Sequence, residues 1–498
     1  MKKQYLLALD QGTTGSTAAL IHSETLEFLG SKNVEFPQHY PAQGQVEHDL
    51  HEIWSSLEEA TRKLFKEFSL TGYEILAIGL TNQRETTCAM DLQGNPLERA
   101  IVWQDRRTAK MCEELDAQGL SPMIKEKTGL FLDAYFSATK MKFFLDNSSK
   151  IQEARQKKNL RFGTIDTFML LKLTSGESYK TEASNASRTM LMNLKTGEYD
   201  DELLKLFGLN KDELPLICDS FSEFGRTKNL SFLPDGIPIT GILGDQQSAL
   251  FGQGLHQRGQ MKCTYGTGAF VLTNTGHQLI ETKELITTVA YSHKGKLNYA
   301  LEGSCFVAGA AIQYLRDNLH FFEKSSESEE LALKADLQKI NGLFFFPFFT
   351  GLGTPYWKSD ARAILVGVGR ETTPAEITYV TLESIAFSVQ LLLETFAQEL
   401  GKKPSLFKVD GGATENNLLM QLQSNLHQLP LSRPQIRETT SFGAALAAAK
   451  GLNLPILNGQ RDYNPMEKTF TPQQKEDHPS FKEERYQEWK KLLTRYYL

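Results

Sequence analysis

The stretch LALDQGTTGSTAAL at residues 7–20 carries the pattern that decides the fold. An apolar, strand-forming run enters a tight glycine- and threonine-rich turn, and a second apolar run follows directly. This order predicts a β-hairpin. Glycine lets the backbone of such a turn approach a phosphate closely, with its N–H groups pointing at the oxygens. Asp10 closes the first strand, where its carboxylate can hold Mg²⁺ directly or through water.

The same pattern recurs near the middle of the chain. MKCTYGTGAFVLTNTG at residues 261–276 predicts a second hairpin with its tip at 266–268, and a third glycine-rich turn at 411–413 follows the strand-like LFKVD. Two similar hairpins half a chain apart indicate an internal duplication. We therefore expect two domains facing a cleft, residues 1–250 and 251–498, with the crossing point near 241–254.

Strands and helices alternate along the sequence. Apolar residues recur at helical spacing from His48 to Phe68, and the strand-like ILAIGLTNQRETTCAMD follows at 75–91. Such alternation is typical of an α/β protein.

Composition excludes several classes of function. The net charge of -6 argues against nucleic acid as the main partner, because phosphate neutralisation needs a basic face. No apolar run approaches the ~18–20 residues that span a bilayer, so we expect no membrane insertion. The five cysteines are scattered and form no CxxC pair, which is typical of a reduced, cytoplasmic protein.

Common catalytic motifs are absent. The chain contains no GxxxxGK[ST], HExxH, GxSxG or paired CxxC sequence, which excludes a Walker phosphate loop among others. The three turns at 10–14, 266–268 and 411–413 remain, and their order and spacing together favour nucleotide phosphate binding.

These turns carry a resemblance to a known family. DQGTT, YGTG and DGGA, in this order, are similar to the phosphate and adenosine turns of the actin, hexokinase and heat-shock chaperone ATPase superfamily. More narrowly, the chain resembles the FGGY family of carbohydrate kinases. The resemblance spans residues 6–450 through stretches that include VEHDLHEIW, GLTNQRETT, IVWQDRRTA, DAYFSATK, NASRTML, GILGDQQSALFGQ and LEGSCFVAGAAIQYLRD.

The resemblance implies a fold and an activity. The expected fold is α/β, with two duplicated ribonuclease-H-like domains around a cleft. The expected activity is ATP-dependent phosphorylation of glycerol to sn-glycerol 3-phosphate in glycerol uptake and catabolism, with Mg²⁺ and ATP as cofactors. Family members also suggest a homodimer or a homotetramer.

Residue by residue, the resemblance assigns an acceptor site. Asp245 is the expected base that takes the proton of a terminal glycerol hydroxyl. Hydrogen-bonding side chains in a partly apolar slot suit an uncharged triol. The expected substrate-binding residues are Arg84, Glu85, Trp103, Tyr135, Asp245, Gln246 and Phe270, with Arg84 and Glu85 pairing and the two bulky rings of Trp103 and Phe270 narrowing the slot.

A second set is expected to bind the nucleotide. The resemblance places Thr13 and Thr14 at the transferring phosphates and Thr267 opposite them. The remaining expected ATP-binding residues, around the ribose and adenine, are Gly309, Gln313, Gly412 and Asn416. Closure of the cleft would join the two halves of the site and exclude water as a competing nucleophile.

The chain departs from the family pattern in a few places. Glycerol-phosphorylating members carry Ser-Ser-Arg after the two threonines, whereas Gly15, Ser16 and Thr17 stand here. The segment LSFLPDGIPIT lacks both the Gly-Gly-x-Arg element for fructose 1,6-bisphosphate and the regulatory histidine of other members. We therefore expect neither form of regulation, and the effect of Thr17 on ATP binding stays open.

Three alternatives stay open at this point. One is an FGGY kinase for another small polyol or ketose. Another is an actin- or chaperone-like ATPase, in which the polar residues around Arg84 would have no purpose. The third is an inactive homologue, which the intact Asp10, Asp245 and Thr267 argue against.

Overall fold

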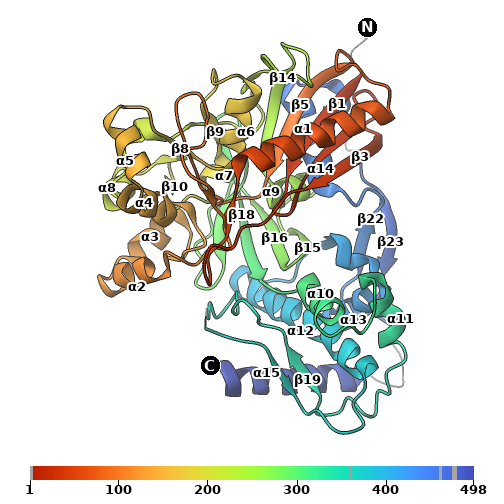
Figure 1. Ribbon diagram of the computed structural model, residues 1–498. Helices are drawn as coiled ribbons and strands as arrows, with labels where there is room; N and C mark the ends of the chain where they lie inside the picture. The colour runs from red at the N-terminus through yellow and green to blue at the C-terminus, as the bar shows by residue number, and fades with distance from the viewer. Residues whose placement is uncertain (1–3, 359, 459–462, 474–478) are drawn as a thin grey trace.

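The computed structural model describes residues 4–358, 360–458, 463–473 and 479–498. The chain folds around two large mixed sheets, one at the upper right of Figure 1 and one across its middle. The first sheet has the order β13-β14-β5-β1-β2-β3. Its strands are β1 (Tyr5–Gln11), β2 (Gly15–His22), β3 (Phe28–Glu35), β5 (Ile75–Asn82), β13 (Gly225–Arg226) and β14 (Pro238–Gly244).

The second sheet repeats this topology with the order β17-β18-β16-β15-β21-β22-β23. Its strands are β15 (Gln260–Tyr265), β16 (Ala269–Gly276), β17 (Ile286–His293), β18 (Lys296–Cys305), β21 (Leu406–Asp410), β22 (Leu431–Pro434) and β23 (Met466–Phe470). In each sheet a hairpin, β1–β2 or β15–β16, is extended by parallel strands, β5 and β14 or β21 and β22. The predicted α/β fold and its duplication are confirmed.

Helices cover both faces of the first sheet. Along β1, Leu7 and Leu9 pack with α1 (Leu50–Glu67) and α6 (Ile165–Leu173), whereas Leu6 and Ala8 pack with α14 (Thr439–Gly451). Successive side chains of a strand point to opposite faces, so the continuous apolar run of the strand buries both faces. The predicted helix at 48–68 is confirmed as α1, which Asp49 caps by accepting a hydrogen bond from the His51 N–H.

The second sheet lies between α9 (Asp245–Gly252) and a larger helical layer. That layer contains α10 (Gly309–Asp317), α11 (Ser328–Ala332), α12 (Pro374–Leu400), α13 (Asn417–His427) and α15 (Pro479–Tyr497), beside the small sheet of β19 (Phe344–Phe346) and β20 (Ile364–Val366). Among the described residues, α12 has the length and composition of a membrane span. However, 83% of the qualifying window is buried, and α12 forms the core of this half.

A lobe of short elements extends from the first sheet, in yellow and orange in Figure 1. Its helices are α2 (Ala109–Ala117), α3 (Ser121–Thr128), α4 (Ser137–Asn147), α5 (Ser149–Gln156), α7 (Ala183–Ala186) and α8 (Asp201–Phe207). Its strands pair as β4 (Glu47–His48) with β7 (Ala100–Ile101), β6 (Cys88–Met90) with β8 (Arg161–Gly163), β9 (Lys180–Glu182) with β12 (Leu216–Cys218), and β10 (Met192–Asn193) with β11 (Glu198–Tyr199).

The two halves of the chain interlock through α14. This helix comes from the second half of the sequence but packs on β1, β5 and β14 of the first sheet, where Figure 1 shows it in blue among the red and orange strands. The approach is close because glycine faces it: a Cβ built on Gly79 would lie 1.9 Å from the Ala444 carbonyl oxygen. The domain boundary at 250/251 falls within α9 and stays a prediction.

We predict that Gly79→Ala destabilises the protein by about 3 kcal/mol, because the added methyl group must push the α14 backbone away from β5. The measurement is the urea dependence of unfolding. Gly412→Ala is the matched control: its Cβ meets nothing within 4 Å, so we expect a change within about 1 kcal/mol. Equal stability of the two variants would contradict the close packing of α14.

Candidate active site

The site begins where three parallel strands end together. The register aligns Gln11 of β1 with Asn82 of β5, and Asn82 with Gly244 of β14. Asp10, the turn after β5 and the first residue of α9 therefore lie at one edge of the first sheet. Ligands of open α/β sheets bind outside the carboxyl ends of such strands. The structure thus brings the predicted Asp10, Arg84 and Asp245 together from distant parts of the sequence.

The turn after β5 holds Glu85 in a rare backbone conformation. Its φ is +60°, and the Thr86 N–H donates to the Arg84 carbonyl at 2.7 Å, which closes a three-residue turn. The Ser137 hydroxyl donates to the Glu85 carbonyl at 2.9 Å and holds the turn in place. A left-handed residue of this kind costs of order 1–3 kcal/mol, and such residues cluster at functional sites.

Arg84 and Glu85 do not hold each other in place, because each forms its short hydrogen bonds with another residue. Arg84 Nε and Glu85 Oε1 are 4.0 Å apart, so the expected direct pair is loose. Arg84 instead donates to both oxygens of Glu302, at 2.6 and 3.0 Å, and Arg188 Nε donates to Glu85 at 2.5 Å. The four side chains are almost fully buried and balance two positive with two negative charges.

Neither Glu302 nor Arg188 was singled out as a site residue from the sequence. Burial alone would raise the pKa of Glu302, but Arg188 and Arg84 together lower it to about 2. The Glu302 carboxylate is therefore ionised at neutral pH. The available signal was a charged residue inside an apolar strand, which is unusual unless that residue is paired.

Asp245 stands at the start of α9 with its carboxylate accessible. Its Oδ1 lies 3.2 Å from Arg84 Nε, and 29% of its side chain is exposed. Gly244 precedes it, and a Cβ there would meet Arg84 Cδ at 2.8 Å, so glycine makes room for the guanidinium. The neighbouring Gln246 accepts a hydrogen bond from Lys262.

Three aromatic rings form a wall beside these polar groups. The Trp103 ring centroid lies 5.6 Å from that of Tyr135 and 6.3 Å from that of Phe270, both edge to face. Trp103, Tyr135 and Thr267 share a cavity of about 130 Å³. Burial raises the pKa of Tyr135, so its hydroxyl stays protonated and can donate.

The wall is tied to the first glycine-rich turn. Trp103 Nε1 donates to the Thr13 hydroxyl at 3.0 Å, and Thr14 beside it is exposed. Thr17, where the resemblance led us to expect an arginine, pairs with Asp10 in the hairpin register and accepts a hydrogen bond from Asn33 at 2.9 Å.

His48, which the sequence did not predict as a site residue, supports the Thr13 turn through Gln38. His48 is fully buried and hydrogen-bonds Gln38 through Nε2 at 2.7 Å, and Gln38 in turn donates to the Thr13 carbonyl at 3.0 Å. Its Nδ1 lies 3.3 Å from the Gln83 amide nitrogen. Burial, together with the nearby His39, lowers the pKa of His48 to about 3, so the imidazole is neutral.

The second sheet presents the opposing turns. Thr267 lies at the tip of the second hairpin, and its carbonyl accepts from the N–H groups of Ala308 and Ala310 at 2.8 and 3.1 Å. Gly309 between them admits no side chain, since a Cβ would lie 2.6 Å from the Gly266 carbonyl oxygen. The start of α10 is thereby locked against the Thr267 turn.

The other predicted nucleotide residues lie on neighbouring elements. Gln313 is exposed on α10, and Gly412 opens onto free space after β21. The side chain of Asn416 caps α13, accepting from the Leu419 N–H at 2.9 Å, and its amide donates to Ser328. The direct contact of Asn416 with a nucleotide therefore stays a prediction.

Mg²⁺ fits the carboxylates at this edge. Burial raises the pKa of Asp10 to about 8, with further contributions from the negative charges of Asp245 and Glu438. A cation beside Asp10 would offset this repulsion. Within the described part of the chain no group of three or more His, Cys, Asp and Glu is arranged to hold a metal. Phosphate oxygens and water would have to complete the shell, which Mg²⁺ commonly accepts.

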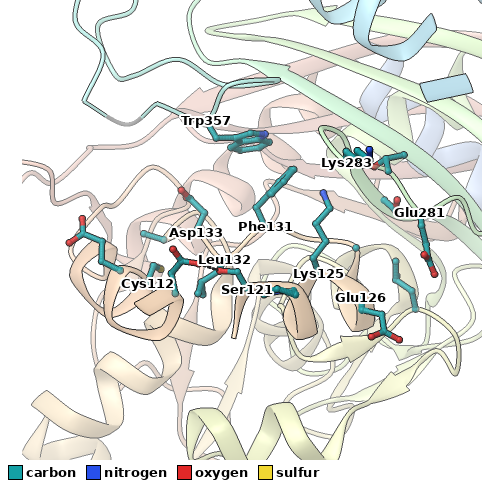
Figure 2. Close-up of a pocket in the computed structure, with 18 of the residues that line it drawn as sticks. Cys112, Ser121, Lys125, Glu126, Phe131, Leu132, Asp133, Glu281, Lys283 and Trp357 are labelled. Atoms are coloured by element: carbon teal, nitrogen blue, oxygen red, sulfur yellow. Dashed lines mark hydrogen bonds between the residues drawn. The ribbon is translucent and has the colours of Figure 1, made fainter. Parts of the chain in front are cut away.

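A larger cavity of about 700 Å³ adjoins this site (Figure 2). Arg106 lines both cavities and is held by the Asp133 carboxylate at 2.6 and 3.0 Å. In Figure 2 the Lys125 side chain runs beside Phe131 toward the second half of the chain, where its Nζ donates to the Leu285 carbonyl at 3.0 Å. This cavity contains none of the predicted site residues.

Comparison with known proteins places the chain in a family. Residues 5–252 match the N-terminal domain of the FGGY family of carbohydrate kinases, and residues 261–452 match its C-terminal domain. The chain is 43% identical over 499 residues to a glycerol kinase from Myxococcus xanthus, covering 99% of each. A crystal structure of Plasmodium falciparum glycerol kinase with ADP is similar, with a TM-score of 0.87 and 32% identity, covering 100% of this chain and 99% of that one. A ligand-bound xylulose kinase from Lactobacillus acidophilus shares the fold, with a TM-score of 0.85 at 20% identity over 99% and 98% of the two chains.

The neutral state of His48 makes stability depend on pH. In the unfolded chain this imidazole binds a proton below about pH 6.5, whereas in the folded protein it binds one only near pH 3. The free energy of unfolding therefore decreases as the pH falls from 6.5 to 3. We predict that, between pH 6 and 4, the free energy of unfolding of the wild type falls faster than that of His48→Gln, by up to about 1.4 kcal/mol per pH unit.

Urea unfolding at several pH values measures this difference. Glutamine retains a donor for Gln38 and does not titrate, so the two curves should run parallel above about pH 7 and diverge in slope only below it. Parallel curves across the whole range would contradict a buried, neutral His48.

Proposed function

The chain belongs to the FGGY family of carbohydrate kinases, and we propose that it transfers the γ-phosphoryl group of ATP to glycerol, giving sn-glycerol 3-phosphate in glycerol uptake and catabolism. One observation carries the proposal. An accessible Asp245 carboxylate stands beside a buried set of charged and aromatic residues, and glycine-rich turns of both sheets flank them. The similarity to glycerol kinases over nearly the whole chain supports the choice of acceptor.

In the proposed reaction Asp245 is the general base. It takes the proton of a terminal hydroxyl while the oxygen of that hydroxyl attacks the γ-phosphorus. The new O–P bond replaces the bond from the γ-phosphorus to the bridging oxygen, and ADP leaves with that electron pair. Phosphoryl transfer requires mainly positioning and charge stabilisation from a protein. Arg84 Nε lies 3.2 Å from Asp245 Oδ1 and orients that carboxylate.

The residues around Asp245 suit a small uncharged triol. Glu85 accepts hydrogen bonds, whereas Arg84 and the protonated Tyr135 donate them, so hydroxyl groups find partners of both kinds. Trp103 and Phe270 would pack against the carbon chain and limit its length. A longer polyol or a ketose would have to displace this aromatic pair.

The glycine-rich turns of both halves of the chain would hold the nucleotide. We assign Thr13 and Thr14 to the transferring phosphates from one side and Thr267 from the other, with Gly309, Gln313, Gly412 and Asn416 around the nucleoside. Bound Mg²⁺ would neutralise phosphate charge, held by Asp10 directly or through water. Closure of the two halves would exclude water from the transferring group.

We place the enzyme in the cytoplasm. Its five cysteines are free thiols, four of them buried, which suits a reducing compartment. A homodimer or a homotetramer stays a prediction from the family resemblance.

We predict that Asp245→Asn lowers kcat for glycerol phosphorylation by about 10²–10⁴-fold, because the amide cannot take the hydroxyl proton. Coupled ADP release with Mg-ATP and glycerol measures the rate. Asp235→Asn, which alters an exposed carboxylate on a loop outside the cleft, should retain the wild-type rate. A rate for Asp245→Asn above one tenth of the wild type would contradict the assigned base.

A further inference from the structure

Two buried charged residues, Lys262 and Glu302, lie in the same cross-strand row of the second sheet. The register aligns Lys262 of β15 with Leu272 of β16, and Leu272 with Glu302 of β18. Leu272 packs with Leu250 of α9, so the row faces the helix that starts with Asp245. Lys262 and Glu302 are both 0% exposed. Two buried charges on an otherwise packed face require partners, and each of the two contacts an acceptor-site residue, Arg84 for Glu302 and Gln246 for Lys262.

Glu302 determines which edge of Arg84 is free. Its two oxygens accept from Arg84 Nη1 at 2.6 Å and Nη2 at 3.0 Å, and Gln247 accepts from Nη1 at 3.2 Å. A planar guanidinium bound by two parallel hydrogen bonds has a fixed orientation. The opposite edge, with Nε, is thereby directed to Asp245.

Arg188 extends the same arrangement to Glu85. Its Nη2 donates to Glu302 Oε1 at 3.0 Å, while its Nε donates to Glu85 Oε1. One carboxylate of the second sheet therefore fixes two arginines of the first half of the chain. Through them it fixes the acceptor carboxylate, Glu85, as well.

Lys262 determines which way the side-chain amide of Gln246 is oriented. Its Nζ donates to Gln246 Oε1 at 2.5 Å and to the Thr264 hydroxyl at 2.6 Å. An ammonium group can only donate, so the amide oxygen of Gln246 must point at Lys262. The amide NH₂ group of Gln246 is left as a donor, suited to a hydroxyl oxygen. Without Lys262 the amide is free to turn over.

Resting on the function proposed above, we propose that Glu302 and Lys262 are positioning residues of the acceptor site. Neither touches the polyol. They set the orientation of Arg84 and the donor side of Gln246 from the second sheet, so the acceptor site is complete only while that sheet is docked against α9. The polar part of the acceptor site therefore depends on both halves of the chain, although Arg84, Glu85, Asp245 and Gln246 all come from the first half.

The experiment compares Glu302→Gln and Lys262→Met with the wild type in Mg-ATP and glycerol. Loss of a charged, buried hydrogen bond should raise the KM for glycerol about 10- to 100-fold. The KM for ATP should change less than threefold. Lys262→Arg, which restores a charged donor, should recover most of the glycerol affinity lost in Lys262→Met.

Glu383→Gln is the matched structural control. Glu383 of α12 forms a buried ion pair with Arg485 of α15 and contacts none of the acceptor residues. We expect a lower unfolding temperature and an unchanged KM for glycerol. Glu302→Asp, which retains the charge, serves if Glu302→Gln does not fold, and its shorter side chain should still raise the KM for glycerol.

Two results would overturn the proposal. In the first, the variants lose thermal stability as Glu383→Gln does, but the KM for glycerol stays within twofold of the wild type. In the second, the KM values for glycerol and ATP rise together. Absence of glycerol-stimulated ATP turnover in the wild type would instead refute the proposed function. The same KM comparison would then be made with the polyol or ketose that does stimulate turnover.

Discussion

The packing of α14 against the first sheet is the constraint on which the rest of the molecule depends. Gly79 allows the helix backbone to approach β5, and a Cβ on Gly443 would lie 1.9 Å from the Ser248 carbonyl oxygen of α9. The two helices therefore cross in near contact, and α9 in turn packs on the second sheet through Leu250. This arrangement turns the carboxyl ends of both sets of parallel strands toward a shared site.

The shared site concentrates charge in a buried part of the protein. Arg84, Arg188, Glu85 and Glu302 are buried together, and removing one member would leave an unpaired charge, a loss of roughly 3–5 kcal/mol in comparable cases. Both oxygens of Glu302 and Oε1 of Glu85 accept hydrogen bonds from the two arginines. A polyol entering beside it meets groups that are already oriented, so little side-chain entropy is lost on binding. The strained turn at Glu85 fits the same interpretation.

Much of the fold could be predicted from the sequence. Two hairpins with glycine-rich tips, each followed by strands and helices, indicated the duplicated α/β architecture because turn residues and strand periodicity are local signals. The site residues came from motif resemblance, and the structure brings Asp10, Arg84, Trp103 and Asp245 together. The local sequence pattern did not reveal which side chains hold these site residues in position. Glu302 and Arg188 act through contacts between residues more than 100 positions apart, and these contacts also explain the loose Arg84–Glu85 pair. His48 acts through Gln38 and Gln83, which lie 10 and 35 positions away. Hydrophobic periodicity does not report such contacts.

The central claim is that this cleft phosphorylates glycerol in preference to longer acceptors. The most direct measurement is kcat/KM for ADP release with Mg-ATP and each of glycerol, dihydroxyacetone, erythritol, xylitol and xylulose. The aromatic pair of Trp103 and Phe270 predicts that glycerol exceeds every longer acceptor by at least about tenfold. A four- or five-carbon acceptor that matches or exceeds glycerol would contradict the account of the acceptor site, while leaving the fold and the family unchanged.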